Sequence, residues 1–167
     1  MSTSNLHRFH TAQAAADSGY ANALAEIRGT GKRTHWIWYI FPQLAGLGRS
    51  PEARRYGLAG RSEAKAYLQD PVLRSRLLEI TRAVAERLES GGSLLNVLGS
   101  QIDVLKLVSS MTLFVHISRE LPAEEPNAEF EALAEAAQRV LKAASEQGYS
   151  ECGFTRQALR DGGPDGA

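Results

Sequence analysis

The chain has 167 residues, of which 43% are hydrophobic and 23% are charged, and its 19 basic residues balance 19 acidic ones. This composition is typical of a single soluble domain with one hydrophobic core, and the zero net charge argues against a nucleic-acid partner. Because Cys152 is the only cysteine, the sequence excludes an intrachain disulfide and a structural zinc site built on several thiolates.

The sequence carries no signal for export or membrane insertion. Its first residues, MSTSNLHRFHTAQ, lack the apolar segment of a signal peptide. No uninterrupted apolar run approaches the roughly 18 residues that can cross a bilayer. These features predict a cytoplasmic protein that does not bind a membrane.

Three helices are expected in the first quarter of the chain. Residues 5–27 are rich in Ala and Gln and predict two helices with a break near Ser18, the second ending at GTG. A third helix should begin near Arg33 and carry the aromatic run HWIWYIFPQ. Pro42 should end it within a residue or two, because proline disfavours helical geometry in the residue before it. The next residues, QLAGLGRSP, predict a loop.

The middle of the chain contains clear helix start signals. Ser62 is expected to cap a short helix, SEAKAYL. Asp70 followed by Pro71 combines a capping carboxylate with proline at the first helical position. Apolar residues then recur at steps of four and three, which predicts a helix with one buried face that ends at SGG. The residues of this stripe are Leu73, Leu77, Ile80, Val84 and Leu88.

Two further long helices are expected after residue 100. Ser100 and Asp103 match a capping box, and the helix behind them, 102–117, is apolar on nearly every side. A helix of this kind is usually central and covered by its neighbours. Asn127 should cap the last long helix, and Gly148 should end it.

The sequence therefore predicts an all-α fold, since no segment alternates apolar and polar residues as a strand does. We expect a single domain of about six to eight helices over residues 1–160, followed by a disordered tail at 161–167. Successive helix pairs joined by short loops fit either a bundle or a short superhelix of stacked antiparallel helices.

The aromatic run supplies the first candidate ligand-binding residues. In a helix, His35 and Trp38 lie on one face, and the run ends in Gln43. An imidazole, an indole N–H and an amide all need polar partners when they are buried. The stretch predicts one wall of a pocket, in which His35 hydrogen-bonds or acts as acid and base and Trp38 stacks on a ligand. The alternative is that these rings are core, as we expect for Trp36.

Polar residues also interrupt the apolar helix 102–117. Asp103, Lys106 and Ser110 lie on one stripe, with Ser109 beside them. A lysine in a central helix must pair with an anion, reach solvent or serve a ligand. Two hypotheses follow. This stripe forms the opposite wall of the pocket, or Lys106 pairs with Asp103 and the serines bond to helical carbonyls.

The sequence predicts no metal site and no cofactor, and it does not identify a reaction. His7 and His10 share a helix face, but nothing else suggests a metal ion. RGTGKRT departs from a phosphate-binding loop, because Arg33 stands where Ser or Thr is required.

The two candidate stretches resemble a bacterial family, domain of unknown function 1810, which is sometimes labelled calpastatin-like. The similarity covers roughly residues 6–114 and rests on K-x-x-HW-x-W-x-IFPQ-x-x-GLG-x-S-x-x-A-x-x-Y and on D-x-x-K-x-x-SSMTLF. It also includes Phe9, Ala12 and Gln13 near the start and the pattern EA-x-AYL-x-x-P-x-L at residues 63–73. The first pattern is matched here by Lys32, His35, Trp36, Trp38, Ile40, Phe41, Pro42, Gln43, Gly46, Leu47, Gly48, Ser50, Ala53 and Tyr56. Beyond Phe114 the chain departs from the family pattern.

The resemblance implies an all-α fold of the armadillo-like, α–α superhelix kind and no established activity. Our main hypothesis is a small polar molecule bound in a pocket between the HWIWYIFPQ and DVLKLVSS helices. The alternative is a helical scaffold for a protein or peptide partner, with the aromatic run as core. The candidate ligand-binding residues are His35, Trp38, Gln43, Ser50, Tyr56, Asp103, Lys106, Ser109 and Ser110.

Overall fold

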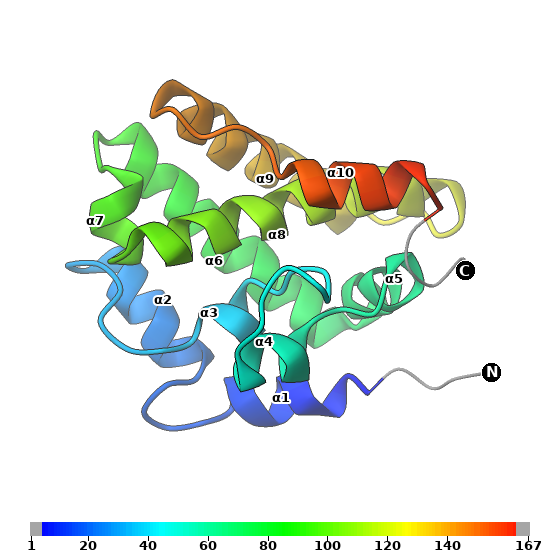
Figure 1. Ribbon diagram of the computed structural model, residues 1–167, viewed down its shortest axis with the longest axis horizontal. Helices are drawn as coiled ribbons and strands as arrows, with labels where there is room; N and C mark the ends of the chain where they lie inside the picture. Colours follow the sequence, from blue (N-terminus) through cyan, green and yellow to red (C-terminus); the bar gives the residue numbers. More distant parts are fainter. Residues whose placement is uncertain (1–4, 163–167) are drawn as a thin grey trace.

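A computed structural model describes residues 5–162 as a single all-helical domain (Figure 1), which confirms the expected fold class. Within these residues the only β-type pairing is an isolated bridge between Leu44 and Leu58. The elements are α1 His7–Gln13, α2 Tyr20–Arg28, α3 Ile37–Ile40, α4 Pro51–Tyr56, α5 Arg61–Gln69, α6 Pro71–Glu89, α7 Leu94–Leu98, α8 Gln101–Glu120, the 3-10 helix η1 Leu121–Ala123, α9 Ala128–Glu146 and α10 Gly153–Arg160.

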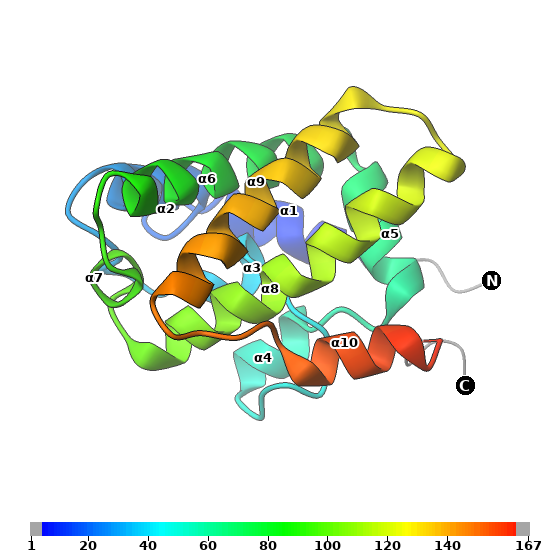
Figure 2. The same cartoon turned by 90° about the horizontal axis from the view of Figure 1, so that it is seen from above.

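Three long helices form the centre of the molecule. α9 packs along both α6 and α8, and Figure 2 shows α8 and α9 running in opposite directions. Val108, Met111 and Leu113 of α8 are at most 3% exposed, as its apolar sequence predicts. The first turns of α8 differ from that prediction, because Ile102 is 65% exposed and Leu105 is 51% exposed.

The predicted start signals of the long helices act as expected. Asp70 accepts hydrogen bonds from the backbone N–H groups of Val72 and Leu73, with Pro71 at the first helical position. Asn127 caps α9 by accepting from the N–H of Glu129. These side chains satisfy N–H groups that have no partner inside the helix.

The aromatic helix is shorter than the sequence predicts. α3 begins at Ile37 rather than near Arg33 and ends two residues before Pro42. The reason lies in α2, whose Glu26 accepts the backbone N–H groups of Arg33 and Thr34 and so holds them in a loop. α5 likewise begins at Arg61, with Gly60 rather than Ser62 at its N-cap position.

Ten α-helices within residues 5–162 exceed the six to eight expected. Three of them, α3, α4 and α7, have only four to six residues. α10 has no counterpart in the sequence-based prediction. It is fixed against α8, where the N–H of Cys152 donates to Thr112 Oγ1 at 3.1 Å. Asp161 follows α10 as its C-cap, and the rest of the predicted tail, 163–167, lies outside the described residues.

None of the helices between residues 5 and 162 combines the length and hydropathy that a bilayer-crossing segment requires.

Candidate functional site

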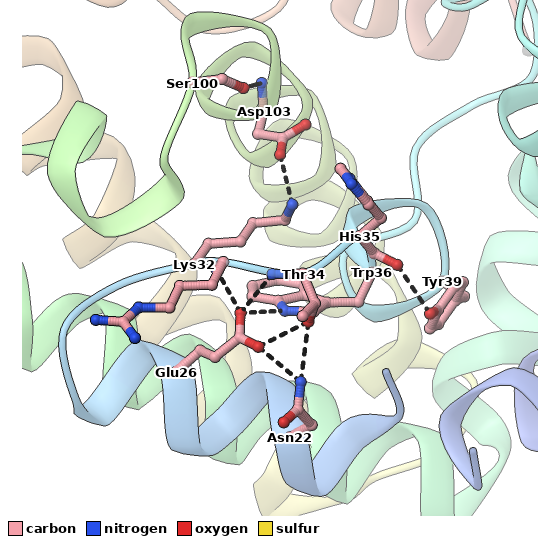
Figure 3. Close-up of polar contacts among 10 residues, drawn as sticks. Asn22, Glu26, Lys32, Thr34, His35, Trp36, Tyr39, Ser100 and Asp103 are labelled. Atoms are coloured by element: carbon pink, nitrogen blue, oxygen red, sulfur yellow. Dashed lines mark hydrogen bonds and ion pairs between the residues drawn. The ribbon is translucent and has the colours of Figure 1, made fainter. Parts of the chain in front are cut away.

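The candidate site is built on the loop between α2 and α3, and Glu26 holds this loop from below (Figure 3). Its carboxylate accepts five hydrogen bonds, from Asn22 Nδ2, the N–H groups of Arg33 and Thr34, Thr34 Oγ1 and Trp36 Nε1. Burial raises the pKa of Glu26, but these bonds outweigh it and lower the pKa to about 2. Trp36 is fully buried, as predicted.

Lys32 fastens the same loop to the α7–α8 turn. Its backbone N–H donates to the carbonyl of Val97 at 2.8 Å, and its Nζ lies 2.7 Å from Asp103 Oδ2. Gly99 permits this approach: it has a φ of +83°, and a Cβ there would lie 2.9 Å from the Lys32 carbonyl oxygen. The loop and the N-terminus of α8 therefore meet although about 65 residues separate them.

Asp103 has a different partner from the one its spacing suggests. Ser100 Oγ accepts the N–H of Asp103 at 3.2 Å, which is half of the predicted capping box. The carboxylate of Asp103, however, pairs with Lys32, and these two side chains are 16% and 6% exposed. The hypothesis that Asp103 pairs with Lys106 is wrong, since Lys32 occupies that place.

A cleft of about 290 Å³, here called the polar cleft, lies between the loop and the start of α8. Four of the predicted residues, two from each candidate stretch, line it. His35 is exposed and lies on the α8 side of the loop, away from Glu26 (Figure 3). The lining residues are Lys32, Arg33, His35, Trp38, Leu98, Gly99, Ser100, Ile102, Asp103 and Lys106.

Lys106 stands where the polar cleft meets two further cavities. One is a void of about 10 Å³ that Trp38, Gln43 and Tyr56 also line. The other, here called the apolar groove, has about 400 Å³. It is lined by Gln43, Leu47, Ile102, Leu105, Lys106, Val108, Ser109, Ser150, Glu151 and Cys152.

Three polar side chains around this junction have no partner among residues 5–162. Lys106 is half-buried and makes no hydrogen bond or ion pair there. Trp38 Nε1 is buried without a hydrogen-bond partner, and the side-chain amide of Gln43, only 8% exposed as a residue, makes none either. Buried donors are normally paired, and Trp38 Nε1 is a buried donor that is not. With Lys106 and Gln43 beside it, the junction is a candidate for a site that receives a partner from outside the chain.

The remaining predicted residues are more dispersed. Ser109 lines the apolar groove, and its hydroxyl donates to the carbonyl of Leu105. Tyr56 lines the void and packs its ring on Phe9 and Tyr39. Ser50 is exposed and caps α4 by accepting the N–H of Ala53, so its observed role is structural.

Ser110 is fully buried and lines none of the cavities described above. Its hydroxyl has no partner within residues 5–162. The structure thus gathers seven of the nine candidates around Lys106 and leaves Ser50 and Ser110 apart.

Sequence reasoning did not place Lys32, Ile102 and Leu105 in the site. Lys32 is the first residue of the quoted family pattern, which could have marked it as a site residue. The pattern does not indicate that its partner is Asp103. Ile102 and Leu105 are spaced i, i+3 on α8, and only the packing of the other helices determines that this face is uncovered.

A larger groove, of about 900 Å³, lies between α9 and the C-terminal end of α8. Its charged residues include Arg119, which donates to Gln138, and Arg139, which pairs with Glu89. The two arginines are therefore already partnered, unlike Lys106 of the polar cleft.

Across residues 5–162, no three His, Cys, Asp or Glu side chains are grouped so as to hold a metal ion.

Comparison with known proteins assigns the chain to a family. The family model described as "Protein of unknown function (DUF1810)" matches residues 3–140, nearly the whole chain. The chain belongs to this family. The match extends well past Phe114 and includes most of α9.

A solved structure is also similar to the chain. It is the crystal structure of the conserved hypothetical protein Rv1873 from Mycobacterium tuberculosis, with 36% sequence identity and a TM-score of 0.69. The alignment covers 92% of this chain and 95% of the other. No curated protein matched the chain.

Proposed function

We propose that this protein binds a small polar molecule in the polar cleft between the α2–α3 loop and α8. The carrying observation is Lys106, a half-buried ammonium that has no partner within residues 5–162 while it lines the cleft with His35 and Trp38. A cavity with a few convergent polar groups on an otherwise apolar wall is the usual form of a small-molecule site.

The two lysines of the cleft then have separate roles. Lys32 is neutralised by Asp103 and holds the loop in place. Lys106 is left to contact the bound molecule, with Trp38 as the flat surface beside it. His35 is exposed at the cleft and is free to hydrogen-bond, since no partner for its imidazole is found in residues 5–162.

The test is an NMR screen of the ¹⁵N-labelled full chain against amino acids, dicarboxylates, nucleosides and sugars. We expect binders to shift the signals of His35, Trp38 and Lys106. Lys106→Met should weaken the affinity of these binders more than about tenfold. Lys142→Met, which removes an exposed lysine of α9, is the matched control. Shifts that gather along the α9 groove instead, or no shifts at all, would reject the proposal and favour the scaffold alternative.

A further inference from the structure

The junction at Lys106 joins two cavities of different character. The polar cleft contains the cations Arg33 and Lys106, while the charges of Lys32 and Asp103 cancel each other. The apolar groove on the other side of Lys106 is walled by Leu47, Ile102, Leu105 and Val108. Ile102 and Lys106 line both cavities, so the two lie next to each other along one side of α8.

The unpartnered side chains that line the polar cleft, Lys106 and Trp38, would be satisfied by a hydrogen-bond acceptor. Lys106 Nζ and Trp38 Nε1 can only donate hydrogen bonds, and the first turn of α8, which also lines the cleft, presents the positive end of a 20-residue helix. A neutral alcohol or an amine would leave at least one of these donors without a strong acceptor. A carboxylate or phosphate oxygen fits them, because hydrogen bonds between charged groups are the strong ones.

The exposed apolar side chains of the apolar groove would be covered by an apolar part of the ligand. Ile102 and Leu105 are more than half exposed, although large apolar side chains on a central helix are normally covered. Glu151 is the one carboxylate that lines this groove among the described residues, and it faces His116 at 3.9 Å. An acidic group would therefore be repelled from the Glu151 end and attracted to the Lys106 end of the groove.

We infer that the molecule bound at this site is an organic anion with an apolar chain. Its acidic group binds at Lys106 beside Trp38, and its chain lies in the apolar groove against Leu105 and Ile102. This inference rests on the proposed function and specifies the class of molecule that the site takes.

The experiment uses octanoate, octanol and acetate as probes of the full ¹⁵N-labelled chain. The two indole N–H signals provide an internal comparison, since Trp36 Nε1 is bonded to Glu26 and Trp38 Nε1 has no partner within residues 5–162. We expect octanoate to move the Trp38 signal and not the Trp36 signal. Octanol and acetate should each bind at least about tenfold more weakly, because each lacks one half of the interaction.

Two variants separate the halves of the site. Lys106→Met should reduce octanoate affinity to that of octanol, whereas Lys142→Met leaves it unchanged. Leu105→Ser should weaken octanoate about fivefold, from roughly 40 Å² of lost apolar contact, and leave acetate unchanged. Its control is Leu95→Ser, because Leu95 is 50% exposed on α7 and lines neither cavity.

The inference is overturned if octanol binds as tightly as octanoate, if Lys106→Met does not change octanoate binding, or if octanoate leaves the Trp38 signal in place. A neutral or cationic molecule from the screen that shifts His35 and Trp38 would overturn the inference and still support the proposed function. Failure of both experiments would reject both.

Discussion

Trp36 and Trp38 are two residues apart in the chain, yet their indole groups have opposite surroundings. Trp36 is fully buried and donates to Glu26 at 3.0 Å, whereas Trp38 is half-buried and its N–H has no partner within residues 5–162. The lysines differ in the same way, since Lys32 is paired with Asp103 and Lys106 is unpaired in that range. The polar groups around Glu26 bond to one another, whereas those around Lys106 remain able to bind a ligand.

The difference separates a structural polar network from a candidate binding site. Around Glu26 every donor that faces the carboxylate is used, which is how buried polar groups are usually arranged. Around Lys106 the half-buried ammonium and the buried Trp38 N–H have no acceptor within residues 5–162, and a bound ligand would offset the stability that this costs. Polarity alone therefore does not mark the site, and neither does a missing partner, since Ser110 also lacks one; the site is marked where unpartnered polar groups line a cavity.

The largest effect should distinguish the two lysines. Lys32→Met removes the partner of a nearly buried carboxylate, so we expect the free energy of unfolding to fall by about 3–5 kcal/mol. Lys106→Met removes an unpaired charge, so the fall should be below about 1 kcal/mol. Urea unfolding of the two variants measures the difference. Equal losses would show that Lys106 has a structural partner and would erase the contrast between the two regions.

The tryptophans should differ by a smaller amount. Trp36→Phe leaves a space in the core and frees one acceptor of Glu26, for an expected loss of about 2–3 kcal/mol. Trp38→Phe removes an unpartnered donor and should cost about 1 kcal/mol or less. Combination with Glu26→Gln gives a thermodynamic cycle in which the effects are non-additive for Trp36 and additive for Trp38. Coupling between Trp38 and Glu26 would contradict the separation of the two networks.

The last effect concerns pH and tests only the Glu26 network. Because the folded chain lowers the pKa of Glu26 from 4.5 to about 2, ionised Glu26 contributes stability above about pH 4.5 and loses it as the pH falls toward 2. Glu26→Gln should therefore flatten the decline of stability over that window. Some decline remains, since Asp70 and Glu89 also have lowered pKa values. Glu135→Gln, at an exposed position, should keep the full slope.

Local signals in the sequence were sufficient for most of the fold. The caps Asp70 and Asn127 and the apolar stripe of α6 predicted helices that the structure contains, because a cap and a helical period act within a few residues. The predicted helix start near Arg33 was wrong because the contact that decides it is not local. Its first N–H groups are taken by Glu26, a side chain on a different helix, and no local propensity encodes that competition.

The sequence by itself determined which residue types could form a site, and it brought His35, Trp38, Asp103 and Lys106 forward as candidates. Only the tertiary structure decided which of them are occupied by partners within the protein. Lys106 is three residues from Asp103 on the same helix, but Lys32 takes the carboxylate because the loop is bonded to Val97 and passes close over Gly99. An ion pair is determined by which charge is brought within about 3 Å, and that depends on the packing of segments far apart in the chain.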